Sequence, residues 1–268
     1  MRMRVLIVAL VFATAAPCAA AARDVELIGL DESNTLLRFT SARPGDVTAT
    51  KVSGINGTLI GIDHRPANRL LYGVSSSNDV YTIDRASGAA SLVSTLTVAF
   101  DAGPRSGFDF NPQADRLRLV GGNGQNLRVH VDLGAAATDG PLRYAAKDPN
   151  AGKRPAIAAA AYTNSVVNAA TTKLFDIDSD LDVLALQDPP NDGVLVTIGP
   201  LGADFGPLAG FDIVTESGVD RAFAVSGSVL YQIDLVTGAA TALGAVGAPA
   251  GVSLIGLTVV PGPEVDRD

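Results

Sequence analysis

The sequence predicts an all-β protein with a five-bladed β-propeller fold, in which the N- and C-terminal strands share one blade. Three observations lead to this fold class. Short runs rich in Val, Leu, Ile, Thr and aromatic residues are separated by 28 Gly and 15 Pro, which is typical of many short strands joined by turns. A landmark tripeptide recurs five times, and the two ends of the chain each supply part of one repeat.

The landmark is a small residue, then a bulky apolar residue, then Asp or Thr. Its period of roughly 45 residues is typical of a four-stranded propeller blade. We interpret it as the innermost strand of each blade, because these strands converge on the axis and only Gly or Ala lets backbones approach closely there. The copies are Gly61-Ile62-Asp63, Gly107-Phe108-Asp109, Ala161-Tyr162-Thr163, Gly210-Phe211-Asp212 and Gly256-Leu257-Thr258.

Each landmark precedes a pair of strands joined by a polar corner. The pairs span 70–84, 117–132, 174–187 and 222–234. A fifth pair at 26–40 has no landmark before it, and the last landmark, at 254–260, has no pair after it, so the two ends complete one blade and close the ring. We expect the corners and the connections between blades to lie on one face of the disc, called here the open face.

Residues 1–22 have the layout of a secretory signal peptide, with a basic head, the apolar run VLIVALVFATAA and small residues before a predicted cleavage site near Ala22. Cys18 is the only cysteine, and its neighbours fit a lipoprotein signal poorly. We therefore expect a secreted or periplasmic protein with a single propeller domain at 23–262 and a flexible tail at 263–268.

Composition excludes several classes of function. The formal net charge of −8 leaves no basic stripe to neutralise phosphates, so we expect no nucleic-acid partner. The mature chain has no cysteine for a disulfide, a thiolate metal site or a nucleophile. No segment after the leader is apolar for long enough to span a membrane, and we expect a monomer.

The motifs GFDFNPQADRLRLVGGNGQNLRVHVD, AAYTNS, TKLFDIDSDLDVLALQDPPNDGVLVTIGPLG and AGFDI occur in this order. Together they resemble a bacterial secreted family, Domain of Unknown Function 4394, over about residues 26–260. The resemblance implies a propeller-like exported protein. It implies no activity and assigns no catalytic residue.

An acidic stretch, KLFDIDSDLDVLALQ, has aspartate at alternate positions. Hard cations such as calcium bind several carboxylate oxygens together, so calcium is a candidate cofactor here. An EF-hand loop is excluded, because its sixth and twelfth positions hold Leu181 and Gln187. The candidate metal ligands are Asp176, Asp178, Asp180 and Asp182.

The repeat offers a second interpretation of this stretch. Residues 178–182 align with the polar corners of the other blades, where Asp and Ser form turn hydrogen bonds. A cation site shared with Asp31, Glu32 or Asp79 from adjacent corners is the alternative.

The inner strands carry a second acidic set, Asp63, Asp109 and Asp212. Paired carboxylates near the axis would suit a glycosidase-like hydrolase, which normally needs one carboxyl distinguished from its mates. These three are repeated rather than specialised, which favours hydrogen bonding imposed by the repeat.

Two arginines, Arg118 and Arg128, have apolar counterparts in most blades and flank an amide-rich corner. The longest connection between blades, 145–159, is expected on the same open face, where binding loops usually lie. The candidate binding residues are Arg118, Asn123, Gln125, Asn126, Arg128, Lys147, Asp148, Lys153 and Arg154.

The sequence therefore favours a non-catalytic module that binds a small ligand, glycan or protein at the open face. One alternative is a lactonase- or glycosidase-like hydrolase with a metal or carboxylates in the central channel. The other is a structural or adhesive surface module, which would expose an apolar patch on its rim.

Overall fold

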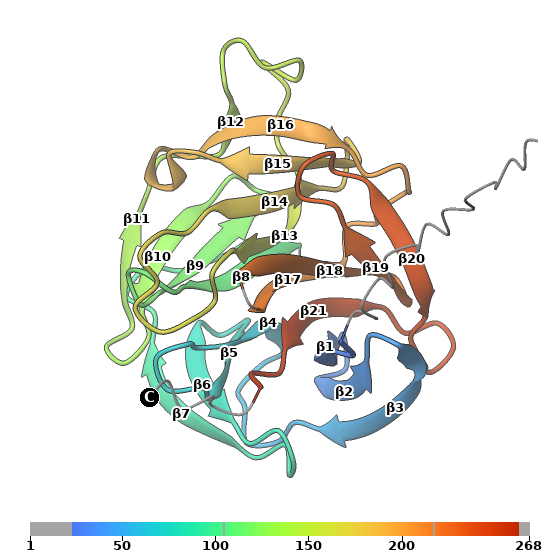
Figure 1. Ribbon diagram of the computed structural model, residues 1–268. Coiled ribbons are helices and arrows are strands. Elements are labelled where there is room, and N and C mark those ends of the chain that lie inside the picture. The colour runs from blue at the N-terminus through green and yellow to red at the C-terminus, as the bar shows by residue number, and fades with distance from the viewer. Residues whose placement is uncertain (1–22, 104, 217, 263–268) are drawn as a thin grey trace, which may run out of the picture.

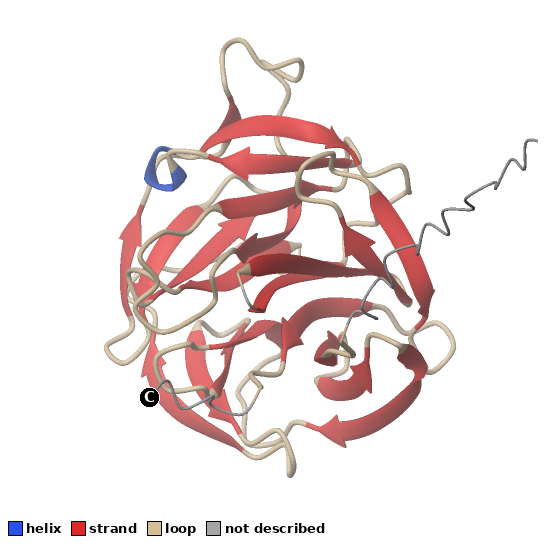
Figure 2. Ribbon diagram, in the orientation of Figure 1, coloured by secondary structure: helices blue, strands red, loops and turns tan. Residues whose placement is uncertain are grey.

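Five small sheets, antiparallel except for one added edge strand, surround a central axis in the computed structural model of the chain (Figure 1). The structure describes residues 23–103, 105–216 and 218–262, so the predicted signal peptide and the predicted tail lie outside the described residues. Strands make up nearly all of the regular structure (Figure 2). The predicted five-bladed propeller is confirmed.

The strands of each blade are given from the axis outward. Blade 1 has β4 (Leu59–His64), β5 (Leu71–Ser75), β6 (Asp79–Ile83) and β7 (Ala90–Thr95). Blade 2 has β8 (Ser106–Asn111), β9 (Arg116–Gly121), β10 (Asn126–His130) and β11 (Ala135–Thr138). Blade 3 has β13 (Ile157–Tyr162), β14 (Leu174–Asp178), β15 (Val183–Gln187), β16 (Val194–Pro200) and an added edge strand, β12 (Arg143–Tyr144). Blade 4 has β17 (Ala209–Glu216), β18 (Val219–Ser226), β19 (Val229–Ile233) and β20 (Ala240–Ala245).

Blade 5 is built from both ends of the chain, as predicted. Its strands are β21 (Leu254–Val259), β1 (Glu26–Asp31), β2 (Thr35–Thr40) and β3 (Arg43–Lys51). The register pairs Leu27 with Val259 and Gly29 with Leu257. This pairing joins the ends of the chain, so the inner strand β21 is part of a four-stranded sheet and the ring is closed.

The core consists of hydrophobic layers between neighbouring blades. Alternate residues of each strand face opposite sides of the sheet, so Phe108 of blade 2 packs with Val74 of blade 1, and Leu257 of blade 5 packs with Val225 of blade 4. Burying one such side chain contributes about 1.5–3 kcal/mol. Inner-strand glycines permit this packing, since a Cβ on Gly210 would collide with the backbone of Gly256.

The landmark of blade 3 lies two residues earlier than the sequence predicts. Ala161 pairs with Phe175, as Asp109 pairs with Arg118 and Asp212 with Phe223. Ala161, not Thr163, is therefore the counterpart of the inner aspartates. The prediction was wrong here because the run of alanines before Tyr162 offers no distinctive side chain to mark the register.

The long connection into blade 3 follows the outer edge of that blade. Strand β12 pairs in parallel with β16, and the segment 145–156 then projects beyond the blade at the top of Figure 1. Asp148 accepts hydrogen bonds from the N–H (2.7 Å) and hydroxyl (2.8 Å) of Thr197 on β16. The described residues include no helix with the length and apolar character of a membrane span.

Candidate functional site

The three inner aspartates form a buried ring near the axis. Asp63, Asp109 and Asp212 are each 5% exposed or less. Each accepts a backbone N–H from the inner strand of the next blade, which joins the two strands. The donors are Phe110 to Asp63 (2.9 Å), Tyr162 to Asp109 (3.0 Å) and Val259 to Asp212 (2.5 Å). The hydrogen bonding that the repeat predicted for these aspartates is present.

Thr258 and Ala161 occupy the remaining places in the ring. The hydroxyl of Thr258 accepts the N–H of His64 (3.3 Å) and donates to Asp63 (2.9 Å). Ala161 has no acceptor, so the N–H of Ile213 instead bonds the carboxylate of the adjacent Asp212 (2.6 Å). The ring is therefore incomplete between blades 3 and 4.

Burial dominates the titration of this ring. It raises the pKa of Asp63 and Asp109 well above the ordinary value, and repulsion between carboxylates adds to the effect. Burial also raises the pKa of Asp212 to about 6 and lowers the pKa of His64 to about 3. These shifts arise from desolvation in a structural network.

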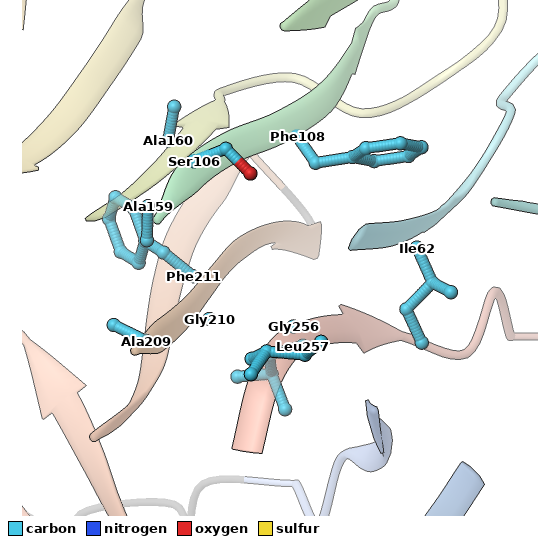
Figure 3. Close-up of a pocket in the computed structure, with 11 residues that line it drawn as sticks. Ile62, Ser106, Phe108, Ala159, Ala160, Ala209, Gly210, Phe211, Gly256 and Leu257 are labelled. Carbon is cyan, nitrogen blue, oxygen red and sulfur yellow. The ribbon is translucent and has the colours of Figure 1, made fainter. Parts of the chain in front are cut away.

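The axial cavity beside the ring is small. Its volume is about 10 Å³, which is about the space that one water molecule needs. Figure 3 shows the side chains of Phe108, Phe211 and Leu257 around it. Ligand pockets usually reach about 300–1,000 Å³, so a sugar ring does not fit here.

The four aspartates of the acidic stretch have separate surroundings. Asp176 lies in the interior of β14 and Asp178 at its end, while Asp180 and Asp182 lie in the corner that follows. Asp180 forms an ion pair with Arg105, and Asp182 accepts the N–H of Phe205 (2.8 Å). The predicted polar corner is therefore present.

Asp178 is occupied by hydrogen bonds from the protein. It accepts the Tyr144 hydroxyl (2.7 Å) and the N–H groups of Ala156 (3.2 Å), Asp180 (3.1 Å) and Leu181 (3.2 Å). Within residues 23–262, apart from the two undescribed positions, no three His, Cys, Asp or Glu side chains converge in a metal-binding arrangement.

The candidate site that departs most from the repeat is the seam between blades 2 and 3. On the blade 2 side, Arg118 is only 2% exposed. Its guanidinium donates to Asp139 (2.6 Å), Asn126 (2.7 Å), Asn191 (2.8 Å) and the hydroxyl of Tyr162 (3.2 Å). The strand pairing places Tyr72, Phe175, Phe223 and Ile28 at the equivalent positions of the other blades. A buried cation therefore replaces a large apolar side chain at this seam alone.

Asp139 links the buried arginine to the surface. It accepts two hydrogen bonds from Arg128, at 2.7 and 2.9 Å, in addition to the one from Arg118. The Asp139 side chain is 5% exposed, whereas the Arg128 side chain is 41% exposed. A bidentate carboxylate fixes the plane of a guanidinium, so Arg128 is held in one orientation where the seam reaches solvent.

The blade 3 side of the seam is also unlike its counterparts. Gln187 is 1% exposed and occupies a position that holds Ile83, Val129, Ile233 and Phe39 in the other blades. Asp176, fully buried, faces the same seam. Burial raises the pKa of Asp176 well above the ordinary value, while Arg118 acts in the opposite direction.

The remaining candidate binding residues form two groups outside the seam. Asn123 and Gln125 bond to each other within their corner (2.7 Å), and Arg154 donates to the carbonyl of Asn123 (3.5 Å). Lys153 donates to Asn150 on the projecting segment (2.9 Å), where Asp148 binds Thr197 and Lys147 is exposed. The structure thus separates the buried Arg118 and Asn126 from the exposed corner and loop.

Sequence reasoning missed Asp139, Tyr162, Asn191 and Gln187 as members of the seam. A signal for Gln187 is present in the repeat, because a polar residue stands where the other blades have apolar ones. Asn191 lies in the turn between β15 and β16, and only the packing of blade 3 against blade 2 brings it to Arg118.

Comparison with known proteins gives a family and a fold. A family model described as a domain of unknown function (DUF4394) matches residues 35–258. No match is found among curated proteins.

Solved structures resemble the chain at low identity. One is a structural genomics protein of unknown function from Bacteroides thetaiotaomicron, with 15% identity and a TM-score of 0.51, covering 83% of this chain and 58% of that one. An auxiliary nutrient binding protein from the same species has 14% identity and a TM-score of 0.45, covering 74% and 55%. Another protein of that description, from Bacteroides ovatus, has 9% identity and a TM-score of 0.41, with the same coverage. The chain thus spans less than two thirds of these proteins, and the likeness is one of fold.

Proposed function

The chain belongs to the Domain of Unknown Function 4394 family, and from this premise we propose that it is an exported, non-catalytic binding module. Its ligand carries a carboxylate, sulfate or phosphate group and contacts the outer end of the seam between blades 2 and 3. The observation that supports this function is the fixed, partly exposed guanidinium of Arg128.

Arg128 has the chemistry of an anion-binding group. Two of its N–H groups bond Asp139, and the other three have no partner among the described residues. A planar guanidinium with fixed donors matches the geometry of an oxyanion. Because Asp139, which Arg118 itself holds, already fixes Arg128 in place, binding costs less side-chain entropy than it would for a mobile arginine.

The segment 145–156, which projects beyond blade 3, carries an excess of positive charge. Residues 145–156 contain Lys147, Lys153 and Arg154 against one acid, Asp148, and Arg143 precedes them in β12. The carboxylate of Asp148 already binds Thr197. In a chain with a net charge of −8, this is a local excess of cations, and such regions attract anionic ligands.

The axial ring supports a non-catalytic role. Its carboxylates bind backbone N–H groups, and the adjacent cavity has a volume of only about 10 Å³. A hydrolase at the axis would need space for substrate next to a free acid and base.

Binding to a panel of immobilised oligosaccharides and peptides tests the proposal. The panel pairs uronate-containing or sulfated oligosaccharides with neutral ones, and acidic peptides with neutral ones. We expect the acidic members to bind and their affinity to fall as salt rises. Hydrogen bonds to a charged group contribute about 1.5–3 kcal/mol, so Arg128→Ala should weaken binding roughly 10- to 100-fold.

Arg38 provides a matched control. It occupies the position equivalent to Arg128 in blade 5, and its side chain is 45% exposed beside Glu26. Arg38→Ala should leave binding unchanged. Selective binding of the neutral members, equal losses in both variants, or turnover of chromogenic glycosides or lactones would each contradict the proposal.

A further inference from the structure

The seam contains three buried oxygen acceptors without protein donors. Asp176 is fully buried, and neither of its carboxylate oxygens has a hydrogen-bond partner among the described residues. The same is true of Oε1 of Gln187. Leaving a buried polar atom unsatisfied costs about 1–3 kcal/mol, and more for a charged group, so each of these atoms requires a physical explanation.

One hydrogen bond determines which polar atom of the Gln187 amide is left without a partner. Nε2 of Gln187 donates to the carbonyl of Pro190 at 2.6 Å. Exchanging the amide oxygen and nitrogen would place two acceptors against each other, so the hydrogen bond determines the orientation. Gln187 pairs with Leu174 and Asp176 pairs with Ala185, two rungs apart on one ladder, so both side chains lie on the same face of blade 3.

Blade 3 has unusually small side chains on either side of Asp176. Ala160 pairs with it from β13 and Ala185 from β15. The counterparts of Ala160 are Ile62, Phe108, Phe211 and Leu257. The counterparts of Ala185 are Tyr81, Leu127, Tyr231 and Leu37. The residues that flank this carboxylate are therefore the smallest of the five blades on both sides.

The charged groups that face Asp176 determine which charge a binding partner of its carboxylate must carry. Arg118 and Arg128 from blade 2 are balanced by Asp139 of blade 2 and Asp178 of blade 3. Arg105, which precedes blade 2, is paired with Asp180 of blade 3, and the phenols Tyr144 and Tyr162 are neutral. An ionised Asp176 adds one uncompensated negative charge. A buried charge of this kind is strongly unfavourable without a counter-charge, so the seam requires one additional positive charge.

We propose that the seam between blades 2 and 3 binds one small monovalent cation, such as sodium or potassium, through both carboxylate oxygens of Asp176 and Oε1 of Gln187. Oxygen ligands of this kind suit hard cations. A divalent ion would leave an excess positive charge beside Arg118. The site uses only one of the four aspartates of the acidic stretch, and it is separate from the anion-binding surface at Arg128.

Urea unfolding in three salts tests the proposal. Wild type, Asp176→Asn and Asp180→Asn are unfolded at pH 7.5 in NaCl, KCl and choline chloride at equal ionic strength. An ion that binds only the folded state raises its stability, so we expect a higher urea midpoint for wild type in NaCl or KCl than in choline chloride. Asp176→Asn should lose this difference. Asp180→Asn, which removes an exposed charge from the same stretch, should keep it.

Gln187→Leu is a second variant in case Asp176→Asn does not fold. It restores the apolar residue of the other blades and removes one ligand, so the difference between salts should shrink. A wild type with the same midpoint in all three salts, whose stability relative to Asp176→Asn falls as pH rises, would show that Asp176 binds a proton and would overturn the proposal. A salt difference that persists in both variants would also overturn it.

Discussion

The axial ring leads to a quantitative prediction for Asp212→Asn. Burial raises the pKa of Asp212 from its ordinary value of 3.8 to about 6. Since the folded-state pKa is the higher one, the folded state holds the proton between pH 3.8 and 6. The stabilising contribution of this group is therefore complete below pH 3.8 and is lost as pH rises through 6.

The magnitude follows from the shift. A difference of one pH unit corresponds to 1.36 kcal/mol, so a change from 3.8 to about 6 corresponds to about 3 kcal/mol. Asparagine does not titrate and keeps an oxygen that accepts the N–H of Val259 or Ile213. Part of this contribution is already lost at pH 4, because the unfolded carboxyl is more than half ionised there. Between pH 4 and pH 7, the unfolding free energy of wild type minus that of Asp212→Asn should therefore fall by about 2 kcal/mol.

Urea unfolding at pH 4, 5, 6 and 7 measures this difference. Asp234→Asn is the control, because Asp234 is exposed and backbone hydrogen bonds lower its pKa. Wild type should gain stability relative to that variant as pH rises through the acid range. A flat difference for Asp212→Asn, or one that grows with pH, would refute the assignment of a buried, proton-holding carboxyl at the axis.

Three further predictions concern the ring, the seam and the acidic corner. Burial lowers the pKa of His64 to about 3. The contribution of the neutral imidazole to the free energy of unfolding is therefore complete above pH 6.5 and falls by about 5 kcal/mol toward pH 3. Because asparagine does not titrate, His64→Asn should shift the acid-unfolding midpoint to lower pH in a circular dichroism titration. Arg118→Met leaves the buried Asp139 with Arg128 alone and should reduce the free energy of unfolding by about 3–5 kcal/mol. Arg116→Met, at the partly exposed start of the same strand, should change it by less than about 0.5 kcal/mol, and a similar loss in both variants would contradict this role. EDTA should leave Tm unchanged, because protein groups already bind the carboxylates of the corner at 178–182; a lower Tm that calcium restores would show a divalent site.

Much of the fold was predictable because its cause is local. Inner strands need small residues where backbones converge at the axis. The landmark tripeptide therefore predicted the register of four of the five inner strands correctly. The predicted register was wrong in blade 3, because a run of alanines carries no distinguishing side chain. The sequence also predicted the shared blade, because each end of the chain carried the part of a repeat that the other lacked.

The candidate site was predictable only in part. Comparison between repeats identified Arg118 as a departure from apolar counterparts, and the structure places it at a buried network. Its burial was not predictable, because a sequence pattern does not show whether an arginine points to solvent or into a seam. Lys147 and Asp148 were expected beside the open-face corner, whereas pairing between β12 and β16 leads their segment along the outer edge of blade 3.

The sequence by itself determined the number of blades, their closure and the residues that break the repeat, because these depend on spacing along one chain. The tertiary structure alone decided which residues surround them. Arg118 and Asp139 come from blade 2, whereas Asn191 and Asp176 come from blade 3, and only packing of blade 3 against blade 2 brings the two pairs to one seam. Packing also determines the charge balance of the seam, since desolvation and contact distance set the free energy of a buried ion.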